Sequence, residues 1–166
     1  MPIDPDLNQQ LDNEEVKCVQ KWLKDSDADL ICDVIKKNKA VKLILARNDL
    51  THEAALKISE AMCTNTSITM LSIAGNQLRD DGVKCFAKML KENTTVQQVF
   101  LSDNFASEQA CDELWAANAT REKPLTDNLY GLVLDHFSPK RRQREAEIAA
   151  EKKASKNKVR LVPGRG

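Results

Sequence analysis

In the six residues IAGNQL, numbered 73–78, the polar Asn76 lies among apolar residues of the kind that fill a protein core. The same arrangement recurs as LARNDL at 45–50 and as LSDNFA at 101–106. The asparagines of the three copies are Asn48, Asn76 and Asn104, and each lies 28 residues from the next. A fixed period of this length is typical of proteins built from stacked repeats, each of which is one supersecondary unit.

The apolar residues of each copy follow two different periods. When the asparagine is counted as the ninth position, positions four and six are apolar in every copy: Leu43 and Leu45, Leu71 and Ile73, Val99 and Leu101. This alternation points both side chains to one face of a short strand. The residues that follow have helical spacing. One strand and one helix per unit predict an α/β solenoid, with a parallel sheet on the concave side and helices on the other.

The pattern resembles the leucine-rich repeat, L-x-x-L-x-L-x-x-N-x-L, and the 28-residue period is similar to the ribonuclease-inhibitor type of that family. The resemblance covers about residues 38–120 and implies three repeats. In size and repeat type the chain is similar to the short repeat domain of the tropomodulins. The resemblance implies a protein-binding module, because leucine-rich repeats mostly bind other proteins.

Helical spacing is also present on both sides of the repeats. Residues 7–24 predict one helix, and Ser26 or Asp27 can begin a second, so residues 1–37 are expected to form an N-terminal helical cap without a strand. After Pro124, a further helix predicts a C-terminal cap over residues 121–138. Residues 139–166 form a basic tail, and their first half consists of strong helix formers with few apolar residues.

The repeated asparagine is predicted to have a structural role. Where a strand turns toward its helix, backbone N–H and C=O groups enter the interior, and an unpaired one costs about 1–3 kcal/mol. A side-chain amide can both donate and accept hydrogen bonds. We therefore predict that Asn48, Asn76 and Asn104 form a ladder that satisfies these backbone groups in successive turns.

The sequence carries no motif for catalysis. None of its serines or cysteines stands in a nucleophile motif, its five glycines form no phosphate-binding pattern, and no carboxylates have the spacing of metal ligands. Asp80 and Asp81 are adjacent but precede a predicted helix, where negative charge favours capping over acid–base catalysis. We therefore expect no enzyme, no cofactor, no metal ion and no small-molecule substrate.

The cysteines and the chain ends bear on the cellular compartment. The five cysteines include no C-x-x-C pair, which favours buried free thiols in a reducing compartment over disulfides or a zinc site. The sequons at Asn65, Asn93 and Asn118 recur because the repeat places polar turn residues at one point, and we expect no glycosylation. With neither a signal peptide nor an apolar run of roughly 18 residues, the sequence predicts a cytoplasmic protein without a membrane span.

Charge is balanced over the whole chain but not along it. Residues 139–166 contain ten Lys and Arg against three Glu, a net charge of +7, which leaves −7 on residues 1–138. The tail could contact nucleic acid, but it has no interleaved aromatic residues for base stacking. It has no apolar face for a membrane. We favour an acidic protein partner over nucleic acid, bound through basic residues of the tail: Lys140, Arg141, Arg142, Arg144, Lys152, Lys153 and Arg160.

The concave face of the sheet is the second candidate binding surface. Ile44, Met70 and Phe100 occupy outward strand positions but are more apolar than ordinary exposed residues, and Met and aromatic residues are enriched at interface cores. Arg47 and Asp103 are expected on the same face. The alternative is that the caps or the tail cover these side chains.

These features favour a non-enzymatic adaptor or structural subunit of a larger assembly. By analogy, the assembly is cytoskeletal or part of the ciliary axoneme, where acidic tubulin or another assembly subunit would suit the basic tail. The alternative is an RNA-associated subunit that uses the tail on phosphate. An enzyme inhibitor is disfavoured because three repeats bury little surface.

Overall fold

The computed structural model describes residues 7, 9, 10 and 12–125 of the 166-residue chain. Most of the expected C-terminal cap helix and the whole basic tail lie outside the described residues. Four strands alternate with helices along the described part. The elements are β1 (Glu15–Lys17), the short 3-10 turn η1 (Asp25–Asp27), α2 (Ala28–Lys36), β2 (Lys42–Ile44), α3 (His52–Thr64), β3 (Met70–Ser72), α4 (Arg79–Glu92), β4 (Gln98–Phe100) and α5 (Glu108–Ala119).

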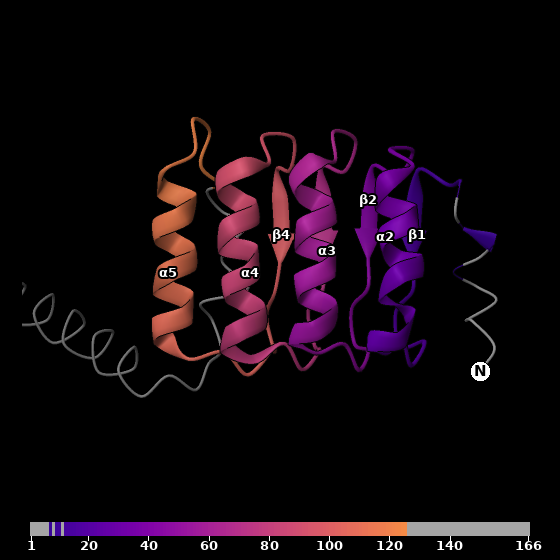
Figure 1. Ribbon diagram of the computed structural model, residues 1–166, viewed down its shortest axis with the longest axis horizontal. Coiled ribbons are helices and arrows are strands. Elements are labelled where there is room, and N and C mark those ends of the chain that lie inside the picture. Colours follow the sequence, from indigo (N-terminus) through magenta and orange to yellow (C-terminus); the bar gives the residue numbers. More distant parts are fainter. Residues whose placement is uncertain (1–6, 8, 11, 126–166) are drawn as a thin grey trace, which may run out of the picture. The chain divides into compact units, whose positions relative to one another are not determined.

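The strands form one parallel sheet in the order β1-β2-β3-β4, and the helices lie side by side along one of its faces (Figure 1). Leu43, Leu71 and Val99 are in register on neighbouring strands, and all three are completely buried. The apolar sides of α2, α3, α4 and α5 close the same core, with Phe86 as its largest fully buried side chain. The predicted α/β arrangement is therefore present in the three units read from the sequence.

The prediction of a helix over residues 7–24 was wrong. Strand β1 lies within this segment and pairs with β2, Val16 being in register with Leu43, so the N-terminal region is a fourth strand–helix unit. The predicted second helix is present as α2. Backbone pairing with β2, which local helical spacing cannot indicate, stabilises the strand. The unit escaped the repeat pattern because Lys21 replaces the asparagine and because the offset to the next unit is 27 residues.

The predicted asparagine ladder is confirmed. Asn76 is almost completely buried, and its amide nitrogen donates to the carbonyl oxygens of Leu45, in the preceding unit, and Ile73, in its own, at 3.1 and 2.8 Å. Its amide oxygen accepts the backbone N–H of Leu50 at 3.1 Å. Asn48 and Asn104 repeat the pattern. Each asparagine therefore joins two neighbouring units at the strand-to-helix turn.

A second ladder, which the sequence analysis did not predict, closes the opposite turns from helix to strand. Asn93 is buried and donates to the carbonyl oxygens of Met62 and Asn65 at 2.6 and 2.9 Å, while its own oxygen accepts the N–H of Val96 at 2.8 Å. Asn65 makes the equivalent contacts one unit earlier. These asparagines belong to the sequons, and their buried, hydrogen-bonded amides explain why the sequons recur.

Arg121 ends this second ladder. It lies 28 residues after Asn93, where another ladder asparagine would stand. Its guanidinium donates to the carbonyl oxygens of Leu90 and Asn93 at 2.9 and 2.6 Å, and to that of Val96 at 2.8 Å. A longer, charged side chain thus satisfies carbonyls that the next repeat would otherwise satisfy.

Gly82 lies inside α4, where a glycine ordinarily lowers helix stability by about 1 kcal/mol relative to alanine. A Cβ atom on Gly82 would lie 2.7 Å from Cβ of Leu78 and 3.2 Å from Cβ of Ala55 in α3. Both distances are shorter than ordinary van der Waals contact. The missing side chain therefore allows α3 and α4 to approach each other closely.

We predict that Asn76→Ala lowers the free energy of unfolding by about 2–3 kcal/mol, because it leaves the buried N–H of Leu50 without its acceptor. The carbonyls of Leu45 and Ile73 keep donors from Asn48 and Asn104. Combining Asn48→Ala with Asn76→Ala removes both donors of Leu45, so the double variant should lose more than the sum of the single losses.

Urea unfolding followed by circular dichroism measures these losses. The exposed Asn13→Ala serves as the matched control and should change the midpoint little. Additive losses in the double variant would contradict shared satisfaction of the Leu45 carbonyl.

We also predict that Gly82→Ala destabilises the protein by about 1–3 kcal/mol, because the clash with Leu78 and Ala55 outweighs the gain in helix propensity. Thermal unfolding measures the effect. The exposed Lys88→Ala in the same helix should be nearly neutral. An increase in melting temperature for Gly82→Ala would show that the contact between α3 and α4 is loose.

Candidate protein-binding surface

The open face is the face of the sheet opposite the helices, formed by the strand residues that point away from the core. Strand register arranges these residues in two rows that cross the sheet. The first row is Glu15, Lys42, Met70 and Gln98, and the second is Lys17, Ile44, Ser72 and Phe100.

The three apolar residues predicted to bind a partner lie on the open face. Ile44 and Phe100 share the second row, and Met70 lies in the first row, diagonal to both. All three are half-buried, whereas their strand neighbours Leu43 and Leu71 are completely buried. The predicted positions are thus confirmed, while their role in binding stays a prediction.

Arg47 and Asp103 are not on the sheet itself, so the prediction that they share its face was wrong. Both follow the strands, in the loops that lead toward α3 and α5, and both side chains are exposed. Their φ angles of 57° and 56° are left-handed, as is that of Gly75 at 69°. This conformation at the eighth position turns the chain out of the strand direction.

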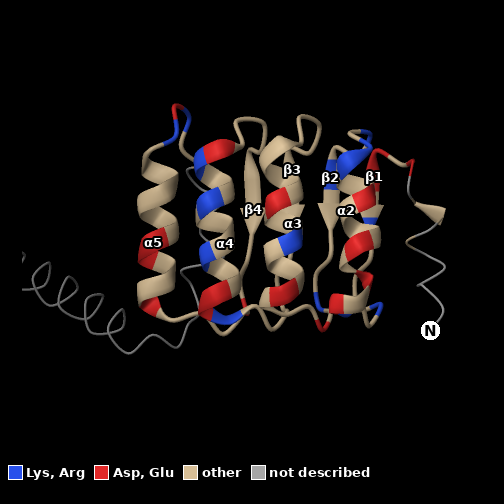
Figure 2. Cartoon of the chain, viewed as in Figure 1, with Lys and Arg blue, Asp and Glu red and all other residues tan. Residues whose placement is uncertain are grey.

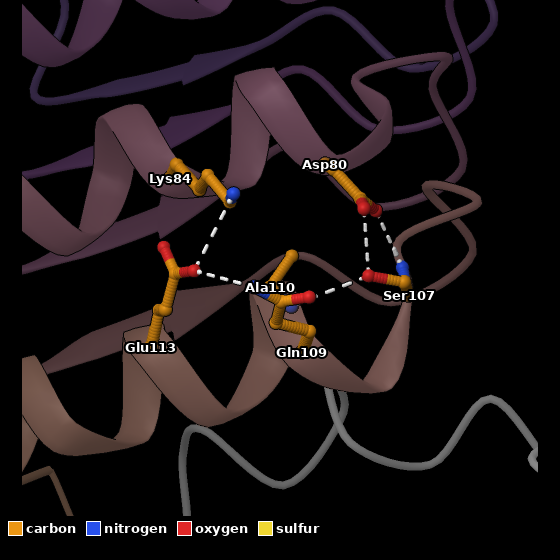
Figure 3. A network of polar contacts seen from close by, with 6 residues as sticks. All are labelled: Asp80, Lys84, Ser107, Gln109, Ala110 and Glu113. Atoms are coloured by element: carbon orange, nitrogen blue, oxygen red, sulfur yellow. Dashed lines mark hydrogen bonds and ion pairs between the residues drawn. The ribbon is translucent and has the colours of Figure 1, made fainter.

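Two aspartates tie the beginnings of neighbouring helices together. Asp80, in the first turn of α4, accepts hydrogen bonds of 2.6 Å from both the hydroxyl and the backbone N–H of Ser107, which begins α5 (Figure 3). Asp25 accepts the same pair of bonds from Thr51, which begins α3. The expected capping role of Asp80 is therefore directed at the next helix rather than at its own.

The contacts with Ser107 also affect the charge of Asp80. The hydrogen bonds from the hydroxyl and then from the backbone N–H of Ser107 lower the pKa of the Asp80 carboxyl below its usual value. The ionised carboxylate is thus the form that the fold favours. Next to this contact, Lys84 of α4 pairs with Glu113 of α5 at 3.4 Å.

The exposed sides of α2, α3 and α4 carry a mixture of acidic and basic residues (Figure 2). Several of these charges pair between neighbouring units, as Lys57 does with Asp29 at 2.7 Å. Such exposed ion pairs contribute about 0–1 kcal/mol to stability. The helical side therefore presents no large area of one charge to a partner in the view of Figure 2.

The cysteines are all free thiols, as predicted. Cys18, Cys32 and Cys111 are buried, but Cys63 and Cys85 are only partly so, which corrects the prediction that all five are buried. Burial, aided by a hydrogen bond with Glu92, raises the pKa of the Cys63 thiol to about 11. Cys63 is therefore a poor nucleophile at neutral pH, because the thiolate is the reactive form.

Within residues 12–125 and the few described before them, no three His, Cys, Asp or Glu side chains form a group that could hold a metal ion. His52 is exposed at the start of α3, and His136 lies outside the described residues. None of the described helices has both the length and the apolar character needed to cross a membrane.

No protein-family model matches the chain. In sequence, it is 33% identical over 98 residues to NACHT, LRR and PYD domains-containing protein 5 of Homo sapiens, across 57% of this chain and 8% of that protein. It is 30% identical over 110 residues to NACHT, LRR and PYD domains-containing protein 9B of Mus musculus, across 63% and 11%. The chain thus spans only 8% and 11% of the lengths of these curated relatives.

In structure, the chain is similar to leiomodin-1 actin-binding site 2, with a TM-score of 0.66, 13% sequence identity, and coverage of 93% of this chain and 99% of that chain. At this identity the likeness concerns the fold alone. The repeated strand–helix units, the ladder asparagines and the sequence relatives agree on the repeat type. The described part of the chain therefore has a leucine-rich-repeat fold.

We predict that Asp80→Asn lowers stability by about 1 kcal/mol at pH 7, because it removes the charge that accepts both bonds from Ser107. A lowered folded-state pKa means that this stabilisation is present above the unfolded value of about 3.9 and is lost as pH falls toward the folded value. The difference between wild type and variant should therefore shrink below about pH 4.

Thermal unfolding between pH 3 and pH 7 checks this dependence. Asp81→Asn, at the exposed neighbouring position, is the control for removing a charge from the same helix turn. A difference for Asp80→Asn that stays constant with pH would contradict the assigned role of the carboxylate.

Proposed function

We propose that this protein is a non-enzymatic adaptor or structural subunit that binds another protein through the open face of its repeat sheet. The observation that carries the proposal is the group of three half-buried apolar residues, Ile44, Met70 and Phe100, on an otherwise polar face. Apolar side chains in this number on a strand surface are typical of an interface core. Protein binding is the use that this geometry supports best.

The repeat architecture favours such a role because it fixes the surface before binding. The parallel register aligns the outward residues of four strands, and the two ladders hold the turns at both ends of the strands. A surface that is already ordered loses less conformational entropy when a partner binds. Affinity can then come from a small number of apolar contacts.

The comparisons support a cytoskeletal setting as part of the proposal. The structurally similar protein is named for an actin-binding site, and the fold is shared over nearly the whole of that chain. We propose a partner in a cytoskeletal or axonemal assembly, with actin and tubulin as the first candidates. The basic residues 139–166 would add steering toward an acidic surface of that partner. A ribonuclease-inhibitor-like repeat type belongs to the same proposal.

The test is a capture experiment with the tagged full-length protein, Phe100→Ser and a chain that ends at Ser138. We predict that Phe100→Ser weakens binding by about 2 kcal/mol, about thirtyfold in Kd, because it removes an apolar anchor. Its melting temperature should change little, because the ring is half exposed. The shortened chain should bind more weakly if the tail anchors the partner.

Leu56→Gln is the matched control, since Leu56 is half exposed on α3, away from the open face. A large loss of stability in Phe100→Ser would show that the ring belongs to the core. Nuclease treatment tests the alternative that the tail binds RNA: partners lost only after nuclease would contradict the adaptor role.

A further inference from the structure

Two large aromatic side chains project from the loops between strands and helices, and neither belongs to the core or the open face. Trp22 is 78% exposed and Phe105 is 72% exposed. They occupy the same position, one residue after the ladder position, in the first and last described units. In the two inner units this position holds Asp49 and Gln77, whose side chains are hydrogen-bonded to each other at 3.2 Å.

The backbone of both aromatic residues is left-handed, with φ of 59° at Trp22 and 57° at Phe105. A bulky residue in this conformation costs on the order of 1–3 kcal/mol, and such strain gathers at functional sites. Exposed rings gain little from burial in return. Core packing therefore does not account for aromatic residues at these two positions.

A groove connects the two rings along the loops. One depression is lined by Trp22, Arg47 and Gly75, among others, and an adjoining one by Gly75, Arg79, Asp103 and Phe105, with Asn48 and Asp49 shared. A Cβ atom on Gly75 would lie 3.1 Å from Cγ of Arg47, so the absent side chain keeps the middle of the groove low.

The groove is about as long as a five-residue extended peptide. Backbone bonds such as Asp49 N–H to Leu23 and Gln77 N–H to Leu50 continue the pairing of units through the loops. At a strand spacing of about 4.8 Å, the first and fourth units are about 14 Å apart, and four residue steps of an extended chain cover nearly the same distance. Residues i and i+4 of such a chain point to the same side.

The charges along the groove are ordered. Arg47 lies in the depression of Trp22, and Asp103 lies in that of Phe105. Among the described residues, neither side chain forms an ion pair with the other charges of the groove, Asp49 and Arg79. A complementary occupant is therefore acidic toward Trp22 and basic toward Phe105.

We propose that this groove binds an extended segment of a partner protein that is apolar at both ends, acidic near Trp22 and basic near Phe105. The rings anchor the apolar ends, and the two charges fix the direction of the segment. This site is separate from the open face, so it does not depend on the function proposed above.

Selection of random nine-residue peptides on the full-length protein tests the proposal, followed by fluorescence polarisation of the most enriched peptide. The enriched peptides should carry an acidic and a basic residue between two apolar ones. Trp22→Asn and Phe105→Asn should each raise Kd about tenfold or more. Neither should lower the melting temperature, because asparagine tolerates the left-handed conformation better than an aromatic residue does.

Charge exchange gives the sharper readout. Arg47→Glu should weaken binding of the selected peptide, and reversing the acidic residue of the peptide to lysine should restore binding to this variant. Leu56→Gln and Phe100→Ser should leave Kd unchanged. The proposal is overturned if no peptide is enriched, if Phe100→Ser abolishes binding, if the aromatic variants bind normally, or if only an oligouridine probe binds the rings.

Discussion

The side-chain amide at each strand-to-helix turn is the interaction on which the other features of the fold depend. Asn76 donates to the carbonyls of Leu45 and Ile73 and accepts the N–H of Leu50, so one buried group joins two consecutive units. Because these units share donors and acceptors, neither turn can relax without leaving a polar group unpaired in the interior. The strand register that aligns the open face, and the loops that form the groove, both follow from this constraint.

The fold could be predicted where the sequence repeats the buried slots faithfully. Alternation at Leu43 and Leu45 and the period of Asn48 and Asn76 were sufficient, because burial and hydrogen bonding demand the same residue types in each unit. The first unit was missed because its ladder position holds Lys21, whose side chain is exposed. There the backbone N–H of Lys21 donates to Asn48 of the next unit, so the turn is satisfied from one side only.

The second ladder was present in the sequence but was interpreted differently. Asn65 and Asn93 are separated by the same 28 residues as the first ladder, yet each precedes a residue pattern that also marks glycosylation sites. Period alone cannot distinguish a solvated turn from a buried one, since both favour asparagine. The binding surfaces divide in the same way. Strand alternation located Phe100, whereas the exposure of Phe105 depends on a left-handed loop conformation that alternation does not describe.

The guanidinium of Arg121 sets how long the stack of repeats is. A further repeat would present a ladder asparagine at this point, and its amide would reach the carbonyls of Leu90 and Asn93, which Arg121 already occupies. One substitution in a duplicated unit is thus enough to turn an internal repeat into a terminal one. Repeat number in such a chain can change by duplication only together with the residue at this position, so gene duplication and the chemistry of a single side chain are linked.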